Sequence, residues 1–292
     1  MTIAQALAVG VMRLRSDAAA EAVRASARAD AQILLGEVLQ LDGAQILAHG
    51  DEELDADLLD VFGLLLGERM RGVPVAYLTH KAGFYGREFY VDETVLVPRP
   101  ESENVVEAVL ADLRARLASG ARPSILDVGT GSGALAITLA AELPEVTVCA
   151  VDLSEAALAI ARRNARELGV GERVTFVASD LTTELTPSAG PFDCIVANLP
   201  YVPSADVPVP PNPVGFEPAA ALDGGEDGLG VYRRLLSELP HLVAPGASLY
   251  FEGAPPVIYP LAGLAKAAFG GAQIRVGEDY AGLERFVAVT LA

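Results

Sequence analysis

The stretch ILDVGTGSGALAI, residues 125–137, constrains the fold more than any other part of the sequence. Apolar residues typical of a buried strand lead directly into Gly129, Gly131 and Gly133, and an apolar helical pattern follows at once. Glycines at such a turn let the backbone reverse tightly and let a ligand approach the amino end of the helix. A strand that passes into a helix in this way predicts a parallel sheet with a ligand site at its carboxyl edge.

Strand and helix patterns continue to alternate after residue 98. SILDV, VTVCAV, RVTFV and FDCIVA are short apolar runs separated by amphipathic segments such as ENVVEAVLADLRARLASG. Such an alternation indicates a parallel sheet covered by helices on both faces. ASLYFEG, AQIRVG and ERFVAVTL add three strands, and the short connection between the last two predicts that these are antiparallel. We therefore expect an α/β fold over residues 99–292, with a doubly wound, mostly parallel sheet and an antiparallel last strand.

The sequence before residue 99 has a different texture. Helical spacing of apolar residues runs through residues 1–75, as in DADLLDVFGLLLGERMRG, and predicts a small helical domain. REFYVD and TVLVP, within residues 76–98, are rich in aromatic and β-branched residues. They predict the two strands of a β-hairpin that links the two domains.

Polar residues at the ends of the next two strands indicate what the glycine turn binds. Asp152 ends the second strand, where its carboxylate could accept both hydroxyls of a ribose, and Asp180 ends the third, near the expected position of an adenine ring. The glycines run G-x-G-x-G and not G-x-G-x-x-G as in dinucleotide-binding proteins, and Asp127 precedes them. This compact pattern resembles class I S-adenosylmethionine-dependent methyltransferases and implies S-adenosyl-L-methionine as the cofactor. The expected cofactor contacts are Asp127, Gly129, Thr130, Gly131, Ser132, Gly133, Asp152, Leu153, Asp180, Leu181 and Asn198.

The fourth strand, FDCIVA, ends in the sequence Asn198, Leu199, Pro200 and Tyr201. An amide or aromatic-amine nitrogen is a poor nucleophile because its lone pair is delocalised. Asn198 could accept one N–H of such a nitrogen, the Leu199 carbonyl could accept another, and Tyr201 could stack on the planar group. These contacts would hold the nitrogen in line with a sulfonium methyl group, so that catalysis is chiefly positioning and electrostatics. We expect these four residues to form the catalytic turn.

Five motifs, taken in order, resemble the HemK/PrmC family of protein-(glutamine-N5) methyltransferases. They are FYVDETVLVPRPESE, ILDVGTGSGALAI, VDLSEAAL, NLPYVP and FEPAAALDGGEDGL, and the resemblance covers nearly the whole chain. It implies methylation of the glutamine in the Gly-Gly-Gln loop of a peptide chain release factor, with residues 1–75 recognising this substrate. It also implies that Asn198 and Tyr201 hold the glutamine amide, and that Arg99 and Glu101 help to close the site.

The chain departs from the family pattern in the catalytic turn. N-P-P-Y is usual in the family, whereas Leu199 stands here in place of the first proline, and N-L-P-Y is similar to ribosomal RNA adenine dimethyltransferases. AYLTHKAGFYGREFYVDE resembles the ribosomal-protein glutamine methyltransferases at least as well. The segment VPSADVPVPPNPVGFEPAAALDGGEDG, residues 202–228, carries six prolines between Pro203 and Pro218 and is expected to form a stiff, substrate-facing wall. Glu217 and Asp206 would add negative charge to this wall, and Glu252, at the end of the fifth strand, is another acidic candidate.

Charge separates the rival functions. The chain has 39 acidic and 21 basic residues, a net charge of −18, which opposes direct binding of nucleic acid and disfavours an adenine-N6 methyltransferase. A guanidinium is planar and cationic, so a free small molecule such as arginine is a rival acceptor, as is a ribosomal-protein glutamine. A cofactor-binding scaffold that has lost activity through Leu199 is the non-enzymatic alternative.

The sequence gives no sign of a metal site or a membrane segment. Its two cysteines lie in apolar runs, and its three histidines are scattered. No basic leader precedes the first helical pattern, and no apolar run approaches the roughly 18 residues that a membrane span needs. We expect a cytoplasmic monomer.

Overall fold

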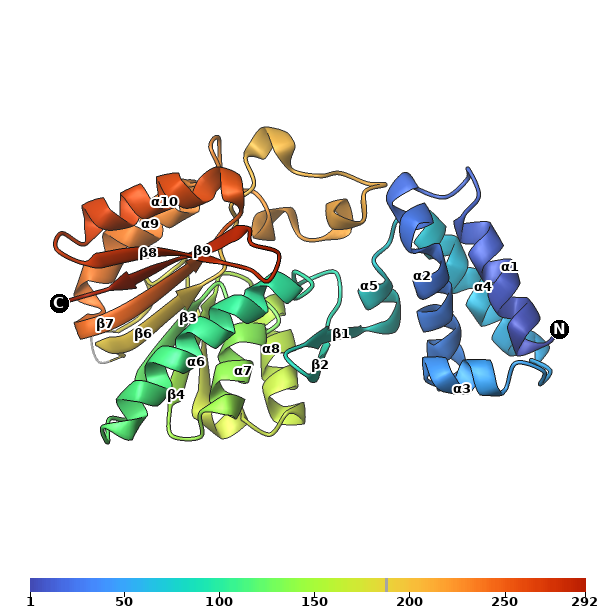
Figure 1. The fold of residues 1–292 in the computed structure, drawn as a ribbon, viewed down its shortest axis with the longest axis horizontal. Coiled ribbons are helices and arrows are strands. Elements are labelled where there is room, and N and C mark those ends of the chain that lie inside the picture. Colours follow the sequence, from blue (N-terminus) through green and yellow to red (C-terminus); the bar gives the residue numbers. More distant parts are fainter. Residues whose placement is uncertain (187–188) are drawn as a thin grey trace. The chain divides into compact units, whose positions relative to one another are not determined.

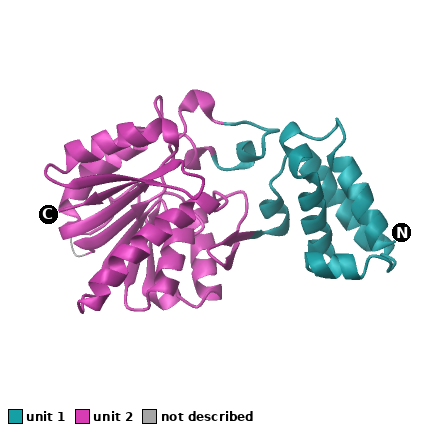
Figure 2. Cartoon of the chain, viewed as in Figure 1, with its two compact units in different colours: residues 1–81, 208–218 teal, residues 82–207, 219–292 magenta. Residues whose placement is uncertain are grey.

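The computed structural model describes residues 1–186 and 189–292. The chain forms two compact units. One contains residues 1–81 together with residues 208–218, and the other contains residues 82–207 and 219–292 (Figure 2). Within the described ranges, no helix is long and apolar enough to cross a membrane.

The first unit is helical, which confirms the expected helical region. Its helices are α1 (Ile3–Leu14), α2 (Glu21–Leu39), α3 (Gly43–Ala48), α4 (Ala56–Met70) and α5 (Val75–Thr79). Capping boxes open two of them, since Thr2 and Asp42 each accept a hydrogen bond from the backbone of a glutamine three residues later. The core is built from the apolar faces of these helices, including Leu14, Val23, Leu34, Leu35, Ile46, Phe62 and Leu66.

A buried ion pair lies inside this helical unit. The Arg69 Nε atom donates to Asp30 at 2.7 Å, and both side chains are less than a tenth exposed. The same guanidinium donates to the carbonyl of Val73 at 3.0 Å, so it fixes the turn that follows α4. In that turn Gly72 has a φ of +104°, and a Cβ atom there would lie 2.1 Å from the carbonyl oxygen of Pro211. Glycine is therefore required for the proline-rich segment to pack against this turn.

The hairpin is present, but one of its two expected strands is wrong. Its strands are β1 (Lys81–Phe84) and β2 (Arg87–Tyr90), joined by Tyr85 and Gly86 with φ values of 49° and 71°. Two consecutive left-handed residues form the tight turn that suits a twisted hairpin. REFY is one of the strands, whereas TVLVP forms no strand because the Asp92 side chain accepts a hydrogen bond from the Thr94 backbone and bends the chain there.

The second unit contains a seven-stranded sheet, as expected. Its strands are β3 (Ser124–Val128), β4 (Thr147–Asp152), β5 (Val174–Ala178), β6 (Phe192–Ala197), β7 (Val243–Glu252), β8 (Gln273–Glu278) and β9 (Glu284–Thr290). Their order is β5-β4-β3-β6-β7-β9-β8. The neighbouring pairs from β5 to β7 are parallel, and β9 is antiparallel to both β7 and β8. The antiparallel pairing predicted for the last two strands is therefore confirmed.

Helices cover both faces of this sheet (Figure 1). The five helices are α6 (Glu103–Ala118), α7 (Ala134–Glu142), α8 (Glu155–Glu167), α9 (Gly230–Glu238) and α10 (Pro255–Ala268). α6, α7 and α8 pack on one face, where Phe84 and Phe89 of the hairpin join the same core. α9 and α10 pack on the other face. From Cys194 to Ala197, successive residues of β6 alternate between the two cores, which explains why every residue of this strand except Asp193 is apolar.

The buried pair of Arg69 and Asp30 leads to a stability prediction. Arg69→Leu leaves a buried carboxylate without its cation and should lower the free energy of unfolding of the helical unit by roughly 3–5 kcal/mol. Arg71→Leu is the matched control, because Arg71 pairs with Glu68 on the exposed surface and should cost less than about 1 kcal/mol. Urea denaturation measures both changes. Equal costs for the two variants would contradict the importance given to the buried pair.

Candidate active site

Parallel pairing gathers the chemically interesting residues at one edge of the sheet. Val128 is in register with Val151 on one side and with Ala197 on the other, so β3, β4 and β6 end together. The glycine turn, Asp152 and the catalytic turn follow these three strand ends. The carboxyl edge at which strand order reverses is the usual ligand site of such sheets.

The glycine turn has the geometry of a ligand cradle. Gly129, Gly131 and Gly133 have φ values of 74°, 55° and 85°, which side chains rarely adopt. A Cβ atom at Gly131 would project into open space, whereas one at Gly133 would lie 2.5 Å from the Ile137 side chain. Gly131 therefore keeps the cradle open, and Gly133 lets the chain enter α7 closely packed.

Asp152 holds the cradle in shape. Its Oδ2 atom accepts from the Gly131 backbone at 2.8 Å, and its Oδ1 atom accepts from the Ser154 backbone at 2.9 Å. Burial raises the pKa of this carboxyl, and the backbone donors oppose that shift. Each carboxylate oxygen keeps a further lone pair, so ribose hydroxyls could still bind there. The next residue, Leu153, is 70% exposed, and places an apolar surface beside this carboxylate.

Asp127 offers a test of whether the edge fits the expected cofactor. The side chain is buried, and Oδ2 accepts from the Thr130 hydroxyl at 2.7 Å and from the Ala136 backbone at 3.2 Å. Oδ1 has no hydrogen-bond partner among the residues that the structure describes. Burial raises the pKa of this carboxyl to about 7. A buried, half-satisfied carboxylate fits a cationic group such as the amino group of S-adenosylmethionine.

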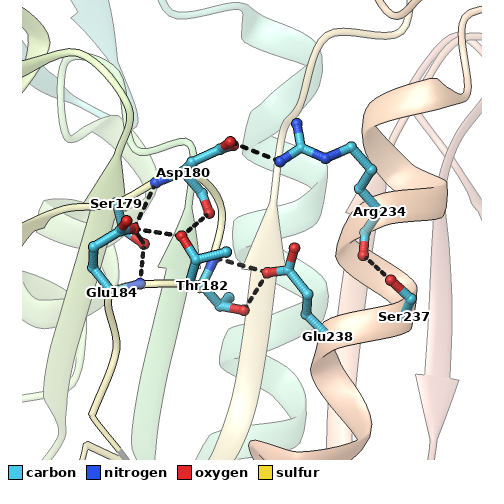
Figure 3. A network of polar contacts seen from close by, with 8 residues as sticks. Ser179, Asp180, Thr182, Glu184, Arg234, Ser237 and Glu238 are labelled. Carbon is cyan, nitrogen blue, oxygen red and sulfur yellow. Dashed lines mark hydrogen bonds and ion pairs between the residues drawn. The ribbon is translucent and has the colours of Figure 1, made fainter.

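Asp180 and Leu181 follow β5, as predicted, but Asp180 is already engaged (Figure 3). Its carboxylate pairs with Arg234 of α9 at 2.7 Å, and its backbone N–H donates to Glu184. Leu181 is buried with a φ of 54°. Since the Asp180–Arg234 pair is about half exposed, we assign it little stability. The contact of Asp180 with the cofactor stays a prediction.

The catalytic turn is anchored from two neighbouring elements. The Leu199 backbone N–H donates to the Tyr232 hydroxyl at 3.2 Å, and that hydroxyl donates to the Glu252 carbonyl at 2.5 Å. Tyr232 is completely buried on α9, so the turn is tied both to a helix and to the end of β7. The Asn198 Nδ2 atom donates to the Ser102 hydroxyl at 3.3 Å, which leaves Oδ1 at the opposite end of the planar amide.

A second glycine-rich loop supports this turn from outside. Its backbone pairs with Val202, which donates to the Leu222 carbonyl and accepts from the Gly224 N–H. A Cβ atom at Gly228 would lie 2.3 Å from the Tyr201 carbonyl oxygen. The sequence places this loop in the expected substrate-facing wall, but its contact with the catalytic turn was not predicted. Its glycines were the available signal, because clustered glycines outside a strand–helix turn indicate close backbone approach.

The structure brings some of the expected acceptor contacts together. Tyr201 is half-buried, and burial together with the charge of Glu252 raises its pKa to about 12, so it stays a neutral ring at physiological pH. Arg285 of β9 lies 3.8 Å from Glu101. Arg99 directly precedes the short 3₁₀ helix Pro100–Ser102.

The acidic residues of the proline-rich segment differ in exposure. Glu217 belongs to the helical unit and is buried, whereas Asp206 is exposed. Their roles, like that of Arg99, stay predictions. The part of the chain that the structure describes contains no cluster of His, Cys, Asp or Glu that could hold a metal ion.

The sheet order, the strand antiparallel to both its neighbours and the glycine turn define a class I S-adenosylmethionine-dependent methyltransferase. Residues 125–209 match the methyltransferase domain family, and residues 10–79 match the PrmC N-terminal domain family. The "Release factor glutamine methyltransferase" of Moorella thermoacetica is 41% identical over 98% of this chain and 97% of its own length. That of Chlorobaculum tepidum is also 41% identical, over 88% of each chain. The protein belongs to the release factor glutamine methyltransferase family.

Solved structures agree on the fold. A 16S rRNA methyltransferase of T. thermophilus, in complex with AdoMet and guanosine, aligns with a TM-score of 0.53 and 21% identity, over 73% of this chain and 50% of that one. A methyltransferase of Pyrococcus furiosus aligns with a TM-score of 0.51 and 18% identity, over 70% of this chain and 89% of that one. At these identities the likeness concerns the fold alone.

Asp152 provides a test of the cofactor site. Asp152→Ala removes the bond to the Gly131 backbone and the predicted charge-assisted bonds to the ribose, worth roughly 1.5–3 kcal/mol, so affinity for S-adenosylhomocysteine should fall about 10- to 100-fold. Asp193→Ala is the matched control, because Asp193 accepts from the Ser124 backbone at the start of β3, away from the carboxyl edge. Calorimetry measures both affinities. An unchanged affinity in Asp152→Ala would remove the ribose assignment.

Proposed function

We propose that this protein transfers the methyl group of S-adenosylmethionine to the N5 side-chain nitrogen of a glutamine in a peptide chain release factor. The observation that carries the proposal is the match, over 98% of the chain, to a relative named for this activity. The catalytic turn supports it independently, because Asn198 is held by its Nδ2 atom and can present Oδ1 to an amide N–H.

The chemistry asks the protein for positioning. The cofactor, when bound, supplies a methyl group on a sulfonium, which is electrophilic without further activation. Asn198 Oδ1 and the Leu199 carbonyl would accept the two N–H groups of the glutamine amide, and Tyr201 would stack on its plane. These contacts align the nitrogen and favour charge development on it. A general base is not needed before attack, since a methylated amide nitrogen loses its proton readily.

Leu199 is compatible with this activity. Its side chain is buried and packs against the glycine turn, since a Cβ atom at Gly129 would lie 2.8 Å from its Cδ2 atom. Its N–H, which a proline would lack, bonds to Tyr232. The family's proline stiffens the turn through its fixed φ, and Leu199 can restrain the same turn through packing and this hydrogen bond. This arrangement argues against a scaffold that has lost activity at Leu199.

We also propose a division of labour along the chain. The methyl transfer would belong to residues 99–292, and residues 1–75 would recognise the acceptor, joined by residues 76–98. The expected cofactor motifs all follow residue 123, and the first 75 residues contain no glycine turn. We further propose that the enzyme is cytoplasmic, because release factors act at ribosomes, and that it is a monomer. Light scattering of the purified protein tests the monomer.

The choice of acceptor can be tested directly. Purified enzyme with labelled S-adenosylmethionine should label a release factor at the glutamine of its Gly-Gly-Gln loop, and should not label ribosomal protein, free arginine or an oligonucleotide. A release factor with that glutamine replaced by alanine is the control and should take up no label. Mass spectrometry locates the methyl group. Label in arginine alone would replace the proposed acceptor by a small molecule.

Two variants of the catalytic turn should behave differently. Asn198→Ala should lower kcat about 10²–10³-fold, or roughly 2.7–4 kcal/mol, by analogy with the loss of one oxyanion-hole donor. Leu199→Pro keeps the carbonyl acceptor and should stay within about tenfold of the natural protein. Affinity for S-adenosylhomocysteine, measured in parallel, should change little in Asn198→Ala. An unaltered kcat in that variant would mean that another group holds the acceptor.

A further inference from the structure

A buried carboxyl lies at the end of β7, beside the strand that carries the catalytic turn. Glu252 is 2% exposed, and its Oε2 atom has no hydrogen-bond partner among the described residues. Its backbone carbonyl accepts a hydrogen bond from the Tyr232 hydroxyl, which fixes the end of the strand. Burying a carboxyl with one oxygen unpaired costs free energy of folding, so the contact of its other oxygen is of interest.

Ser102 connects this carboxyl to the catalytic asparagine. Its hydroxyl donates to Glu252, and the same oxygen accepts from Asn198 Nδ2 at 3.3 Å. Ser102 is 4% exposed and ends the 3₁₀ helix Pro100–Ser102. The three side chains therefore form a short chain of hydrogen bonds, all within the methyltransferase unit.

The chain of hydrogen bonds has a direction. A carboxylate can only accept, so the Ser102 proton must point to Glu252 and the remaining lone pairs of the hydroxyl are left for Asn198. Only the NH₂ end of the Asn198 amide can bind these lone pairs, and the oxygen end must face the other way. We propose that Glu252, acting through Ser102, is a positioning residue that holds Asn198 with Oδ1 directed at the acceptor nitrogen. For the identity of the acceptor, this inference rests on the proposed function.

Burial and the charges around Glu252 make the direction of these hydrogen bonds sensitive to pH. Burial is the largest influence and raises the pKa of Glu252 to about 7. Glu101 raises this pKa further, while Ser102 and the guanidinium groups of Arg99 and Arg285 lower it. The two tyrosines that interact with the carboxyl, Tyr201 and Tyr232, have raised pKa values and stay neutral.

Protonation of Glu252 would allow the chain of hydrogen bonds to reverse. A neutral carboxyl can donate to Ser102, whose proton is then free to point at Asn198. The amide would turn by half a revolution to meet it, and Oδ1 would be lost to the acceptor. The ionised form is the active one, so kcat should rise with pH through about 7.

Kinetics at saturating S-adenosylmethionine test the inference on a release factor, since saturation keeps the titration of Asp127 out of kcat. Ser102→Ala should lower kcat about three- to tenfold, the equivalent of one neutral hydrogen bond, with little change in KM for the release factor. Its kcat should also lose the rise near pH 7. Ser102→Thr restores a hydroxyl and should recover most of the lost kcat. Ser248→Ala is the matched control, because it removes a second buried serine, which lies in β7 and accepts a hydrogen bond from Arg116.

A second measurement needs no acceptor. In NMR spectra of the free protein, the side-chain amide resonances of Asn198 should shift as the pH passes through the pKa of Glu252. This shift should disappear in Ser102→Ala. The Glu252 carboxyl should titrate at higher pH in that variant, because it has lost a donor to its charged form. The inference would be overturned if the Asn198 amide resonances of the natural protein did not change with pH. It would also be overturned if Ser102→Ala and Ser248→Ala had the same kcat. A natural protein that shows these shifts but does not methylate release factor would refute the proposed acceptor alone.

Discussion

The parallel pairing of β6 beside β3 is the constraint on which the rest of the site depends. Only this pairing places the turn after Ala197 next to the turn after Val128, although some 70 residues separate them in sequence. Both strands are buried on both faces, so a slip in register would move polar side chains into one core or the other. Packing and chemistry thus share one requirement, because the register that buries the strands also joins the glycine turn to the catalytic turn.

Much of this arrangement could be predicted from the sequence, because its signals are local. The glycine turn, the alternation of apolar strands with amphipathic helices and the Asn198 turn are each read within about 20 residues. Ser102 and Tyr232 could not be found in this way, since their bonds to the catalytic turn span 96 and 33 residues. TVLVP has strand propensity but forms no strand, because Lys81–Phe84 pairs with Arg87–Tyr90 in its place and the Asp92–Thr94 hydrogen bond bends the chain that follows. Strand propensity alone could not show which segment would pair with Arg87–Tyr90.

Two half-satisfied carboxyls flank the catalytic turn in the order of the sheet. Asp127 lies in β3 and Glu252 ends β7, and β6 lies between these two strands. Burial raises the pKa of both to about 7. Each carries a desolvation cost in the free protein that a donor or a cation can relieve. Ligands that supply such groups should therefore stabilise the folded enzyme beyond the contacts they make elsewhere.

Residues 208–218 give the two units an unusual connectivity. The polypeptide crosses from one unit to the other at 81/82, at 207/208 and at 218/219. A single cut therefore cannot release either unit intact, since a cut after residue 81 leaves the helices without the segment that packs at Gly72. An exchange of helical units between relatives has to carry both pieces, and a chimera that moves only the first 81 residues would combine mismatched surfaces. Recombination at one point is thus a poor route to an exchange of whole units in this architecture.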